Sequence, residues 1–551
     1  MIKMPESDKR NLWTQNYVFL FLASLLALGC LFFGQRLTHI GSLGDEKYYL
    51  VIIQNFPQVV FSMGLDEYRL QRILPSALVH YSLRLFNLPL TPENIVQAFG
   101  IWNVFLSGLI AFLWCLIAQE LHISIRGRWL GFVALFLNYH MLKYIPFIQI
   151  STDLFAYALT LGLVYFYLRD SCPGLMILTV LGSFCWPTLV YLGTALLFFP
   201  RNPIPFSESR PAPFRFPIVF AGLLGILVLW YMQRLLQWMT MGQIYQYGIF
   251  SMGSNRPFSP AIYLSIGIVI LFLFFAVSQL MNRKEIFQKD FLRRSFRVGR
   301  IVLGLLLLLL IKGVIFYLAR EQNARPVMYL ITNLLMVSVM HPGTFFISHV
   351  LFFGPVLIFL LFLWRPFCRL VQQQGWGLLI CVFLSIVFSL DSESRKQMTT
   401  YPLIVPFLIK VTESYHWPKF YDGFMILLSF LFSKVWMRMN NQNWGTRHRQ
   451  RGHPNPTAGK EPPENKKGNK NNQTPENGCR QAAQFNQSLR VTPIEKMIRH
   501  PDHLQHQKGM MEILYILLDK FDLFRLIGMV AEGKVIVPDI EKKRQRQDKD
   551  Q

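Results

Sequence analysis

Three stretches of the chain, 17–34, 261–281 and 344–364, contain no Lys, Arg, Asp or Glu. Each is close to the roughly 17 to 25 residues that a helix needs to cross the hydrocarbon core of a bilayer. Lipid offers no hydrogen-bond partners, so the backbone of such a stretch must satisfy its own polar groups within a helix. The short alternating segments of a membrane β-barrel are absent from the sequence. We therefore expect an all-α, polytopic membrane protein.

Further apolar stretches predict about 11 to 13 transmembrane helices in total. The stretch 174–199 is too long for one simple crossing and contains Trp186-Pro187. Proline removes a backbone donor, so we expect two half-helices there. The candidate crossings are 17–34, 95–119, 129–148, 153–168, 174–199, 216–235, 261–282, 301–319, 344–364, 375–390, 400–411 and 421–438, with 325–340 as a weaker one.

The formal net charge of +24 would be typical of a nucleic-acid-binding protein if it formed one patch. The basic residues lie instead in short loops between apolar stretches and in the tail, as the positive-inside rule predicts. We expect contacts with anionic lipid, no nucleic-acid partner and a cytoplasmic N-terminus. The loops that then face outward are 35–94, 149–152, 236–260, 320–343 and 391–399.

Composition divides the chain into a membrane domain, 1–438, a linker, 439–490, and a tail, 491–551. The linker is rich in Asn, Gln, Pro, Lys and Gly, which predicts disorder. The tail regains helical periodicity over 508–530, which is suited to a protein partner or to the membrane interface. Strict alternation puts the basic tail outside, whereas its charge favours the cytoplasm, so one of 400–411 and 421–438 is a candidate not to cross.

The first outward loop carries the most informative polar residues. Asp45 and Glu46 lie near its start, where a carboxylate can act as a general base or a metal ligand. The segment 66–87 has apolar residues at helical spacing, which predicts an amphipathic helix in the membrane interface. Its Arg69 and Arg72 are either snorkelling side chains or phosphate ligands, because guanidinium matches phosphate oxygens bidentately.

Two later outward loops add candidates. Asp153 ends a Ser-Thr-Asp turn, where it either supports the chemistry or stabilises a helix N-terminus. Arg395 and Lys396 lie in a charged connector, where they either bind a donor phosphate or anchor the connector at the interface.

Three ionisable residues fall within apolar stretches: His140, Lys143 and Lys312. Polar groups there are costly in lipid, so we expect them to face a protein cavity, and Lys312 to have a buried partner. They would be pathway residues in a transporter or lipid flippase, although no internal repeat supports that alternative. A third alternative is a non-catalytic scaffold that recruits a partner through its tail.

The order of these elements carries a family resemblance. A short N-terminus and one membrane helix precede Asp45, the segment 68–75 reads Tyr-Arg-Leu-Gln-Arg-Ile-Leu-Pro, and Ser-Thr-Asp at 151–153 and Glu-Ser-Arg at 393–395 follow. Over about residues 10–438 the chain resembles the glycosyltransferase-C superfamily. Within it, the chain is similar to polyprenyl- or dolichyl-phosphate-sugar-dependent mannosyltransferases of an uncharacterised bacterial type.

The resemblance implies an inverting sugar transfer from a polyprenyl-phosphate donor at the outer face of a bacterial inner membrane. It implies that Asp45, with Glu46 beside it, is the catalytic base or a metal ligand, that Asp153 is the second acidic residue, and that Arg395 binds the donor phosphate. The second loop has one carboxylate and no Asp-x-Asp pair, so no clear ligand motif supports a divalent metal. This interpretation requires Asp45, Asp153 and Arg395 to converge on one outward cavity.

Overall fold

The structure is a computed structural model that describes most of the expected membrane domain. The described residues are 6–36, 45–203, 260–282, 287–319, 343–391, 393–415, 418 and 420–437. The expected crossings 216–235 and 325–340, the linker 439–490 and the tail 491–551 lie outside these ranges.

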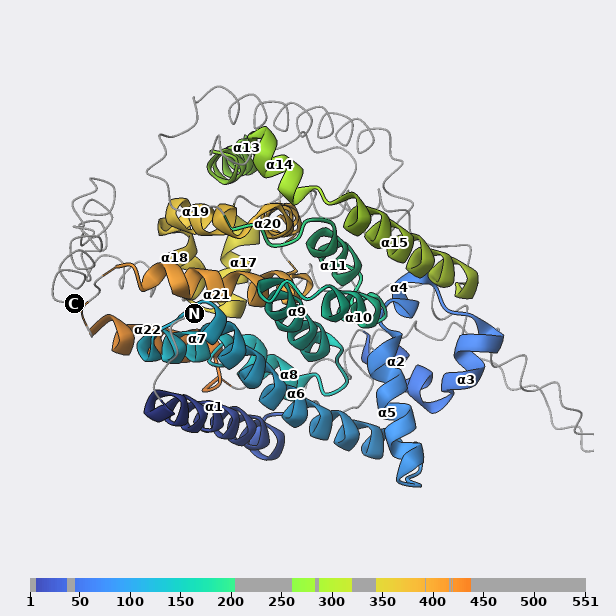
Figure 1. The fold of residues 1–551 in the computed structure, drawn as a ribbon. Helices are drawn as coiled ribbons and strands as arrows, with labels where there is room; N and C mark the ends of the chain where they lie inside the picture. Colours follow the sequence, from blue (N-terminus) through green and yellow to red (C-terminus); the bar gives the residue numbers. More distant parts are fainter. Residues whose placement is uncertain are drawn as a thin grey trace, which may run out of the picture. The chain divides into compact units, whose positions relative to one another are not determined.

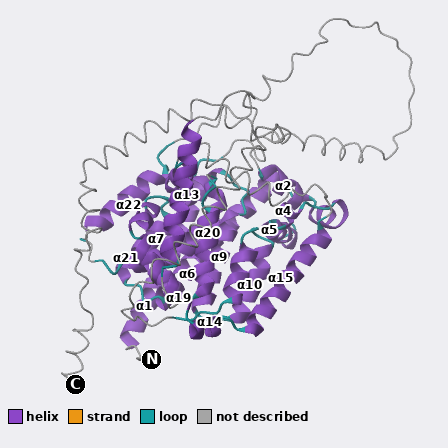
Figure 2. Ribbon diagram, turned by 90° about the horizontal axis from the view of Figure 1, so that it is seen from above, coloured by secondary structure: helices purple, strands orange, loops and turns teal. Residues whose placement is uncertain are grey.

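The described elements are helices joined by short loops (Figure 2), which confirms the all-α prediction for this part of the chain. An isolated bridge joins Leu65 to Ala319. The elements are α1 (Glu6–Phe33), α2 (Glu46–Gln54), α3 (Phe56–Gln58), the π-helix η1 (Val59–Met63), α4 (Glu67–Leu70), α5 (Ile73–Leu85), α6 (Pro92–Glu120), α7 (Ile125–Phe136), the π-helix η2 (His140–Tyr144), α8 (Ile145–Phe147), α9 (Asp153–Leu168), α10 (Cys172–Ser183), α11 (Leu189–Phe198), α13 (Pro260–Leu280), α14 (Lys289–Ser295), α15 (Val298–Leu318), α17 (Thr344–Phe353), α18 (Val356–Phe362), α19 (Trp364–Gln374), α20 (Trp376–Phe388), the 3-10 helix η5 (Ser394–Met398), α21 (Thr400–Thr412) and α22 (Phe420–Ser433).

The chain is an integral membrane protein. Among the described residues, three helices are long and apolar enough to cross a membrane: 16–33 within α1, α6 and α15. A fourth is added if α18 and α19, which are bent by 87° at their junction, count as one span. Eight shorter apolar helices have 10–17 residues. These apolar helices agree with a polytopic α-helical membrane protein, and two of the expected crossings, 216–235 and 325–340, lie outside the described residues, so the total of about 11 to 13 transmembrane helices stays a prediction.

The first helix presents an apolar stripe away from the protein. Tyr17, Phe21, Leu25 and Phe32 are 65%, 66%, 53% and 72% exposed, at spacings close to whole helical turns. The opposite side of α1 packs against α6 (Figure 1). A helix that buries one face in protein and exposes large apolar side chains on the other suits a lipid-facing position, as the sequence predicts.

The expected crossing 129–148 is broken, which corrects the sequence prediction. Helix α7 ends at Phe136, and the π-helix η2 follows. Asn138 causes the change: its side-chain amide donates to the carbonyls of Ala134 and Leu135, and its Oδ1 accepts from the N–H of Met141. An Asn side chain that competes for backbone groups in this way ends a regular helix.

The expected crossing 344–364 is also divided, into α17 and α18. Gly354 has φ of 94°, a conformation that favours glycine, and Pro355 follows without a backbone N–H. By contrast, the break predicted within 174–199 is confirmed, because α10 ends at Ser183 and α11 begins at Leu189.

The described part of the loop 35–94, which we expected to face outward, is more structured than one amphipathic helix. It holds α2, α3, η1, α4 and α5, and the predicted helix over 66–87 is divided at Gln71 and Arg72. Arg72 does not lie on an exposed polar face: it is 4% exposed and points into the protein. This burial contradicts the snorkelling interpretation of Arg72, because its charge is paired inside the fold, and the phosphate-binding interpretation stays a prediction.

Helix α9 lies at the centre of the described helices and packs against α6, α10, α11 and α21 (Figure 1). Its buried side chains include Leu154, Phe155 and Tyr157. The 3-10 helix η5 and α2 are packed around its N-terminal side, where η5 contacts α9 directly. The N-terminus of α9 thereby comes to share one region with two segments that are far away in the sequence.

Candidate active site

Arg395 joins two carboxylates that come from distant parts of the chain. Its Nε lies 2.9 Å and 3.0 Å from the two carboxylate oxygens of Asp153. Its Nη1 donates to Oδ2 of Asp45 at 3.0 Å. Arg395 lies in η5, Asp153 is the first residue of α9, and Asp45 immediately precedes α2. The three residues that the sequence selected for convergence therefore form one ion-paired cluster.

Asp153 is the fully buried member of the cluster. Its side chain is 0% exposed, and its backbone N–H donates to Oγ of Ser151 at 3.2 Å. A buried carboxylate is destabilising unless it is paired and hydrogen-bonded, and Arg395 supplies that pairing. The position at the start of α9 adds the favourable end of the helix dipole. The structure thus supports the capping interpretation and the site interpretation of Asp153 together.

Asp45 is the accessible member, with a side chain that is 32% exposed. Its Oδ2 accepts a second hydrogen bond, from Nη1 of Arg72 at 3.3 Å. Burial raises the pKa of the Asp45 carboxyl. The charges of Arg395, Arg72 and Arg69 together lower this pKa by more than burial raises it, so the pKa lies below its ordinary value. Asp45 is therefore ionised at neutral pH, and it is the carboxylate of the cluster that a substrate can reach.

Arg72 is held between two aromatic rings. Its guanidinium carbon lies 4.2 Å from the centroid of Tyr68 and 4.0 Å from that of Trp186. Its Nη1 also donates to the hydroxyl of Tyr49 at 3.3 Å. Stacking and burial of this kind suit guanidinium rather than ammonium, so Arg72 is a fixed positive charge beside Asp45.

The structure separates Glu46, Arg69 and Lys396 from this cluster to different degrees. Glu46 is buried, and its Oε1 accepts from the N–H of Ile150 at 3.4 Å, which links α2 to the turn before α9. Arg69 pairs with Asp66 at 2.9 Å instead of contacting Asp45. Glu46 therefore has a positioning contact here, and Arg69 contributes charge at longer range.

Lys396 is paired within its own connector. Its Nζ contacts Asp391 and lies 3.1 Å from a carboxylate oxygen of Glu393. Burial lowers the pKa of Lys396, but the charges of Glu393 and Asp391 raise it more, so that it ends above its ordinary value. This pairing favours the connector-anchoring interpretation of Lys396 over direct phosphate binding.

Among the described residues, the three intramembrane candidates have no hydrogen bond or ion pair with the cluster. Lys312 pairs with Glu67 at 2.8 Å, but the side chains are 33% and 44% exposed, so the expected buried partner is exposed in part. Lys143 is 5% exposed and donates to Oε1 of Gln35 and to the carbonyl of Met437.

His140 is 0% exposed, and neither ring nitrogen has a hydrogen-bond partner within the described structure. Its ring is stacked between those of Tyr157 and Phe352, with centroids 6.0 Å and 5.6 Å away. The expectation that His140 faces protein instead of lipid is confirmed, whereas a cavity around it is not.

Sequence reasoning missed several residues that build the site. Trp186, Tyr49 and Tyr68 surround Arg72, and His349 contacts the connector that carries Arg395. The Trp-Pro pair had signalled a helix break, but nothing local in the sequence links that break to an arginine more than a hundred positions earlier.

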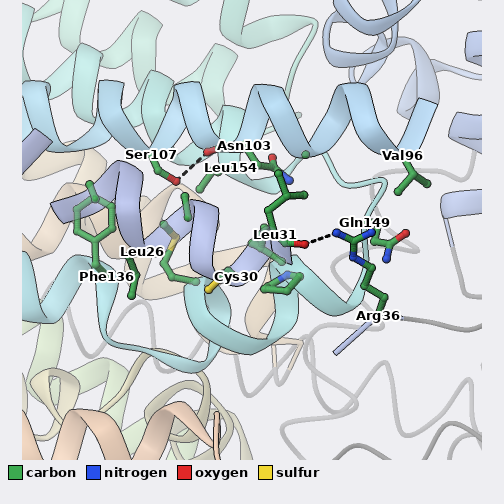
Figure 3. A pocket seen from close by; sticks show the side chains of 16 residues that line it. Leu26, Cys30, Leu31, Arg36, Val96, Asn103, Ser107, Phe136, Gln149 and Leu154 are labelled. Atoms are coloured by element: carbon green, nitrogen blue, oxygen red, sulfur yellow. Dashed lines mark hydrogen bonds between the residues drawn. The ribbon is translucent and has the colours of Figure 1, made fainter. Parts of the chain in front are cut away.

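Two apolar cavities lie near the elements of the site, and neither is lined by the cluster itself. One lies between α1, α6 and the 136–154 segment (Figure 3) and has Arg36, Asn103 and Gln149 among its lining residues. The other is lined by aromatic and aliphatic side chains of α13, α17, α18, α20 and α21, together with Gln397 and Thr400 next to η5. Asp45, Asp153 and Arg395 are not among the lining residues of either cavity, so the expected outward cavity at the cluster stays a prediction.

The charged cluster does not fit a divalent cation. Among the described residues, no group of three or more His, Cys, Asp or Glu side chains could hold a metal ion. Arg395 also occupies the position between the two carboxylates where a bridging cation would have to lie. The pairing satisfies both Asp45 and Asp153 with a guanidinium, so we derive no step through a metal.

No protein-family model matches the sequence, and no curated protein matches it. The structure is similar to an archaeal oligosaccharyltransferase from Archaeoglobus fulgidus in complex with an inhibitory peptide and a dolichol-phosphate, with a TM-score of 0.38 and 10% identity over 77% of this chain and 56% of that chain. It is also similar to the oligosaccharyltransferase of that organism tethered with an acceptor peptide, with a TM-score of 0.37 and 12% identity over 76% and 55%.

This chain therefore spans little more than half the length of these two neighbours, 56% and 55%. With both TM-scores below 0.5, the likeness carries no weight for an activity or a substrate.

Proposed function

We propose that this chain is a membrane glycosyltransferase that transfers a sugar from a polyprenyl-phosphate donor to an acceptor hydroxyl, with inversion at the anomeric carbon. The observation that carries the proposal is the cluster in which Arg395 joins the accessible Asp45 to the buried Asp153. In the proposal Asp45 is the base and Arg395 is the phosphate-binding cation, and the two lie side by side on segments that the sequence predicts to face outward. The family resemblance of the sequence supports the same assignment.

In the proposed reaction Asp45 is the general base. Its ionised carboxylate takes the proton of the acceptor hydroxyl as the hydroxyl oxygen bonds to the anomeric carbon. The bond from that carbon to the phosphate oxygen breaks, and its electron pair leaves with the polyprenyl phosphate. The proton ends on Asp45 and the new glycosidic bond has inverted configuration, so atoms and charges balance.

Arg395 and Arg72 would stabilise the leaving phosphate. Its negative charge grows as the bond to the sugar breaks, and guanidinium groups bind phosphate oxygens bidentately. Arg395 is preorganised for this task because both oxygens of Asp153 hold its Nε. Asp153 would act through Arg395 as a positioning residue, not as a second base.

The cavity next to η5 supports a lipid-borne donor. Gln397 and Thr400 line one part of it, close in sequence to Arg395; His349, Ser385 and Ser389 add polar groups, and most of the remaining lining is apolar. A polyprenyl chain in this cavity would bury its apolar surface while its phosphate reaches Arg395. The lipid-facing helices around the cavity would let the donor enter sideways from the bilayer.

The decisive experiment is sugar transfer by the purified full-length chain in lipid, with radiolabelled polyprenyl-phosphate sugars and membrane-extract acceptors. We expect Asp45→Asn to abolish transfer and Asp170→Asn, which removes a surface partner of Arg300 at 2.7 Å, to leave it unchanged. Equal transfer by wild type and Asp45→Asn would remove Asp45 from the mechanism. Transport of an unmodified lipid that depends on Lys312, Lys143 and His140 would favour the flippase alternative.

Location and partners form a separate proposal. We place the chain in a bacterial inner membrane with a cytoplasmic N-terminus and an outward-facing cluster, on the distribution of its basic loops. Reporter fusions after residues 90 and 395 should report the outer face, and fusions after residue 126 the cytoplasm. The opposite pattern would overturn the orientation. The tail, 491–551, is proposed as the segment that a protein partner would bind.

A further inference from the structure

The connector between α20 and α21 has to hold a strongly constrained arginine. Residues 389–398 join two membrane helices, and Arg395 must meet Asp153 and Asp45 from this connector. A loop that presents a guanidinium to a phosphate loses affinity if it fluctuates, because ordering it then opposes binding. What fixes this connector is therefore relevant to the proposed site.

His349 of α17 is hydrogen-bonded to the connector at two residues, Ser389 and Ser394. Its Nε2 lies 2.9 Å from the carbonyl oxygen of Ser389, and its Nδ1 lies 3.0 Å from Oγ of Ser394. A carbonyl oxygen only accepts, so the network assigns the proton to Nε2, and Nδ1 accepts from the hydroxyl of Ser394. His349 and Ser394 are 5% and 7% exposed, so both bonds are shielded from solvent.

The same side chain lines the second apolar cavity. His349, Ser389 and Gln397 are all among its lining residues. Gln397 in turn donates to the carbonyl of Phe388. The polar residues on this part of the cavity wall are thus the residues that hold the connector, so His349 lies between the cavity and the segment that carries Arg395.

From these contacts we infer that His349 is a positioning residue, which holds the 389–394 segment so that Arg395 meets Asp153 and the donor phosphate. The phosphate half of this inference rests on the proposed function, whereas the holding of the connector does not. His349 touches neither the phosphate nor the reacting atoms, and it acts through the connector alone.

The test uses the full-length chain in nanodiscs and two variants of the same position. His349→Phe keeps a planar ring and removes both hydrogen bonds, and His349→Gln keeps an amide that can still donate to Ser389. The matched control is Gln372→Leu, because Gln372 is equally buried and bonds two carbonyls at the end of α13, away from the connector.

Hydrogen exchange measures the holding directly. We expect amides of 389–398 to exchange about tenfold faster in His349→Phe, with little change in His349→Gln or in Gln372→Leu. In kinetics, His349→Phe should raise the KM for the donor about tenfold, leave the KM for the acceptor unchanged, and be rescued in His349→Gln. A merely structural lesion would lower the amount of active protein without moving the donor KM.

Four outcomes decide the matter. Unchanged exchange over 389–398 in His349→Phe overturns the inference, as does an equal donor-KM shift in Gln372→Leu. Faster exchange together with the donor-KM shift supports it in full. Faster exchange in a protein whose wild type neither binds polyprenyl phosphate nor transfers sugar overturns the proposed function and leaves the holding of the connector supported.

Discussion

Nη1 of Arg395 lies 3.0 Å from Oδ2 of Asp45, although 350 positions separate the two residues in the sequence. The contact links the first outward loop to a connector near the end of the membrane domain. In the structure Arg395 therefore occupies one oxygen of the Asp45 carboxylate, which we propose as the base. A donor phosphate that engages Arg395 would weaken this contact, and would thereby leave Asp45 more basic when the acceptor is in place.

That relationship predicts a pH signature. The acidic limb of kcat/KM reports ionisations of the unliganded enzyme, and that of kcat reports those of the substrate complex. Because Arg395 and Arg72 lower the pKa of Asp45 in the unliganded protein, we expect the acidic limb of kcat to lie at higher pH than that of kcat/KM. Coincident limbs measured over the same buffers would contradict a donor that shares Arg395 with Asp45.

The same lowered pKa predicts a pH-dependent effect on stability. The folded pKa of Asp45 lies below its unfolded value, so its stabilising contribution is present above the unfolded pKa and is lost as pH falls through the folded pKa. Asp45→Asn should therefore lower the unfolding temperature at neutral pH and have a smaller effect in strong acid. Thermal unfolding in detergent at several pH values checks this, with Asp170→Asn as the exposed control.

Removing Arg395 alone should destabilise the protein more than removing both Arg395 and the charge of Asp153. Arg395→Gln leaves the fully buried Asp153 without its counter-ion, which is expected to destabilise by roughly 3–5 kcal/mol and to abolish transfer. In the double variant Asp153→Asn/Arg395→Gln, both charges are absent, so most of the stability should return while transfer stays lost. Thermal unfolding and transfer assays on the wild type and the two variants separate the two effects. A double variant as unstable as Arg395→Gln would show that Asp153 does not depend on this counter-ion.

The sequence was sufficient for the helical membrane fold and for three members of the cluster. Asp45, Asp153 and Arg395 each follow or precede an apolar stretch, so periodicity and charge placed them on outward loops. What it did not reveal depended on contacts across the fold. The burial of Arg72 requires Trp186 from another helix, and the contact between His349 and Ser394 requires α17 to pack against η5.

Prolines mark two of the helix breaks in the sequence, at Trp186-Pro187 and at Gly354-Pro355, but only the first was used to predict a division. Trp186-Pro187 indicated the division of 174–199, but the break near Asn138 depends on one side chain choosing backbone partners. Hydropathy averages over such a residue, so 129–148 read as one crossing. Local hydrogen-bond competition is invisible to periodicity, so the apolar pattern could not predict this break.

Glu67 and Lys312 form an ion pair, and removing one or the other charge should have unequal effects on stability. Leu309 and Leu310 beside Lys312 are 67% and 64% exposed, so this part of α15 faces lipid. Glu67→Gln would leave the ammonium without its counter-ion there, at a cost of roughly 2.5–3.5 kcal/mol. Lys312→Met should be close to neutral in unfolding temperature, and the double variant should resemble it. Loss of sugar transfer in Lys312→Met, with stability intact, would instead assign Lys312 a functional role.

Lys143 offers a test that separates a structural from a transport role. Its Nζ donates to Gln35 Oε1 at 2.9 Å and to the carbonyl of Met437 at 2.7 Å, which ties the end of α1 and the segment after α22 to η2. Lys143→Met removes both bonds in a buried position, so we expect the protein to lose about 1–3 kcal/mol of stability. Lys410→Met, which removes a partly exposed lysine bonded to the carbonyl of His122, should have a smaller effect.

If Lys143 instead lines a transport pathway, Lys143→Met would keep the unfolding temperature of the wild type and lose lipid or solute flux in proteoliposomes. A fall in unfolding temperature with transfer per folded molecule unchanged would assign Lys143 to the packing of the end of α1 and the segment after α22 against η2.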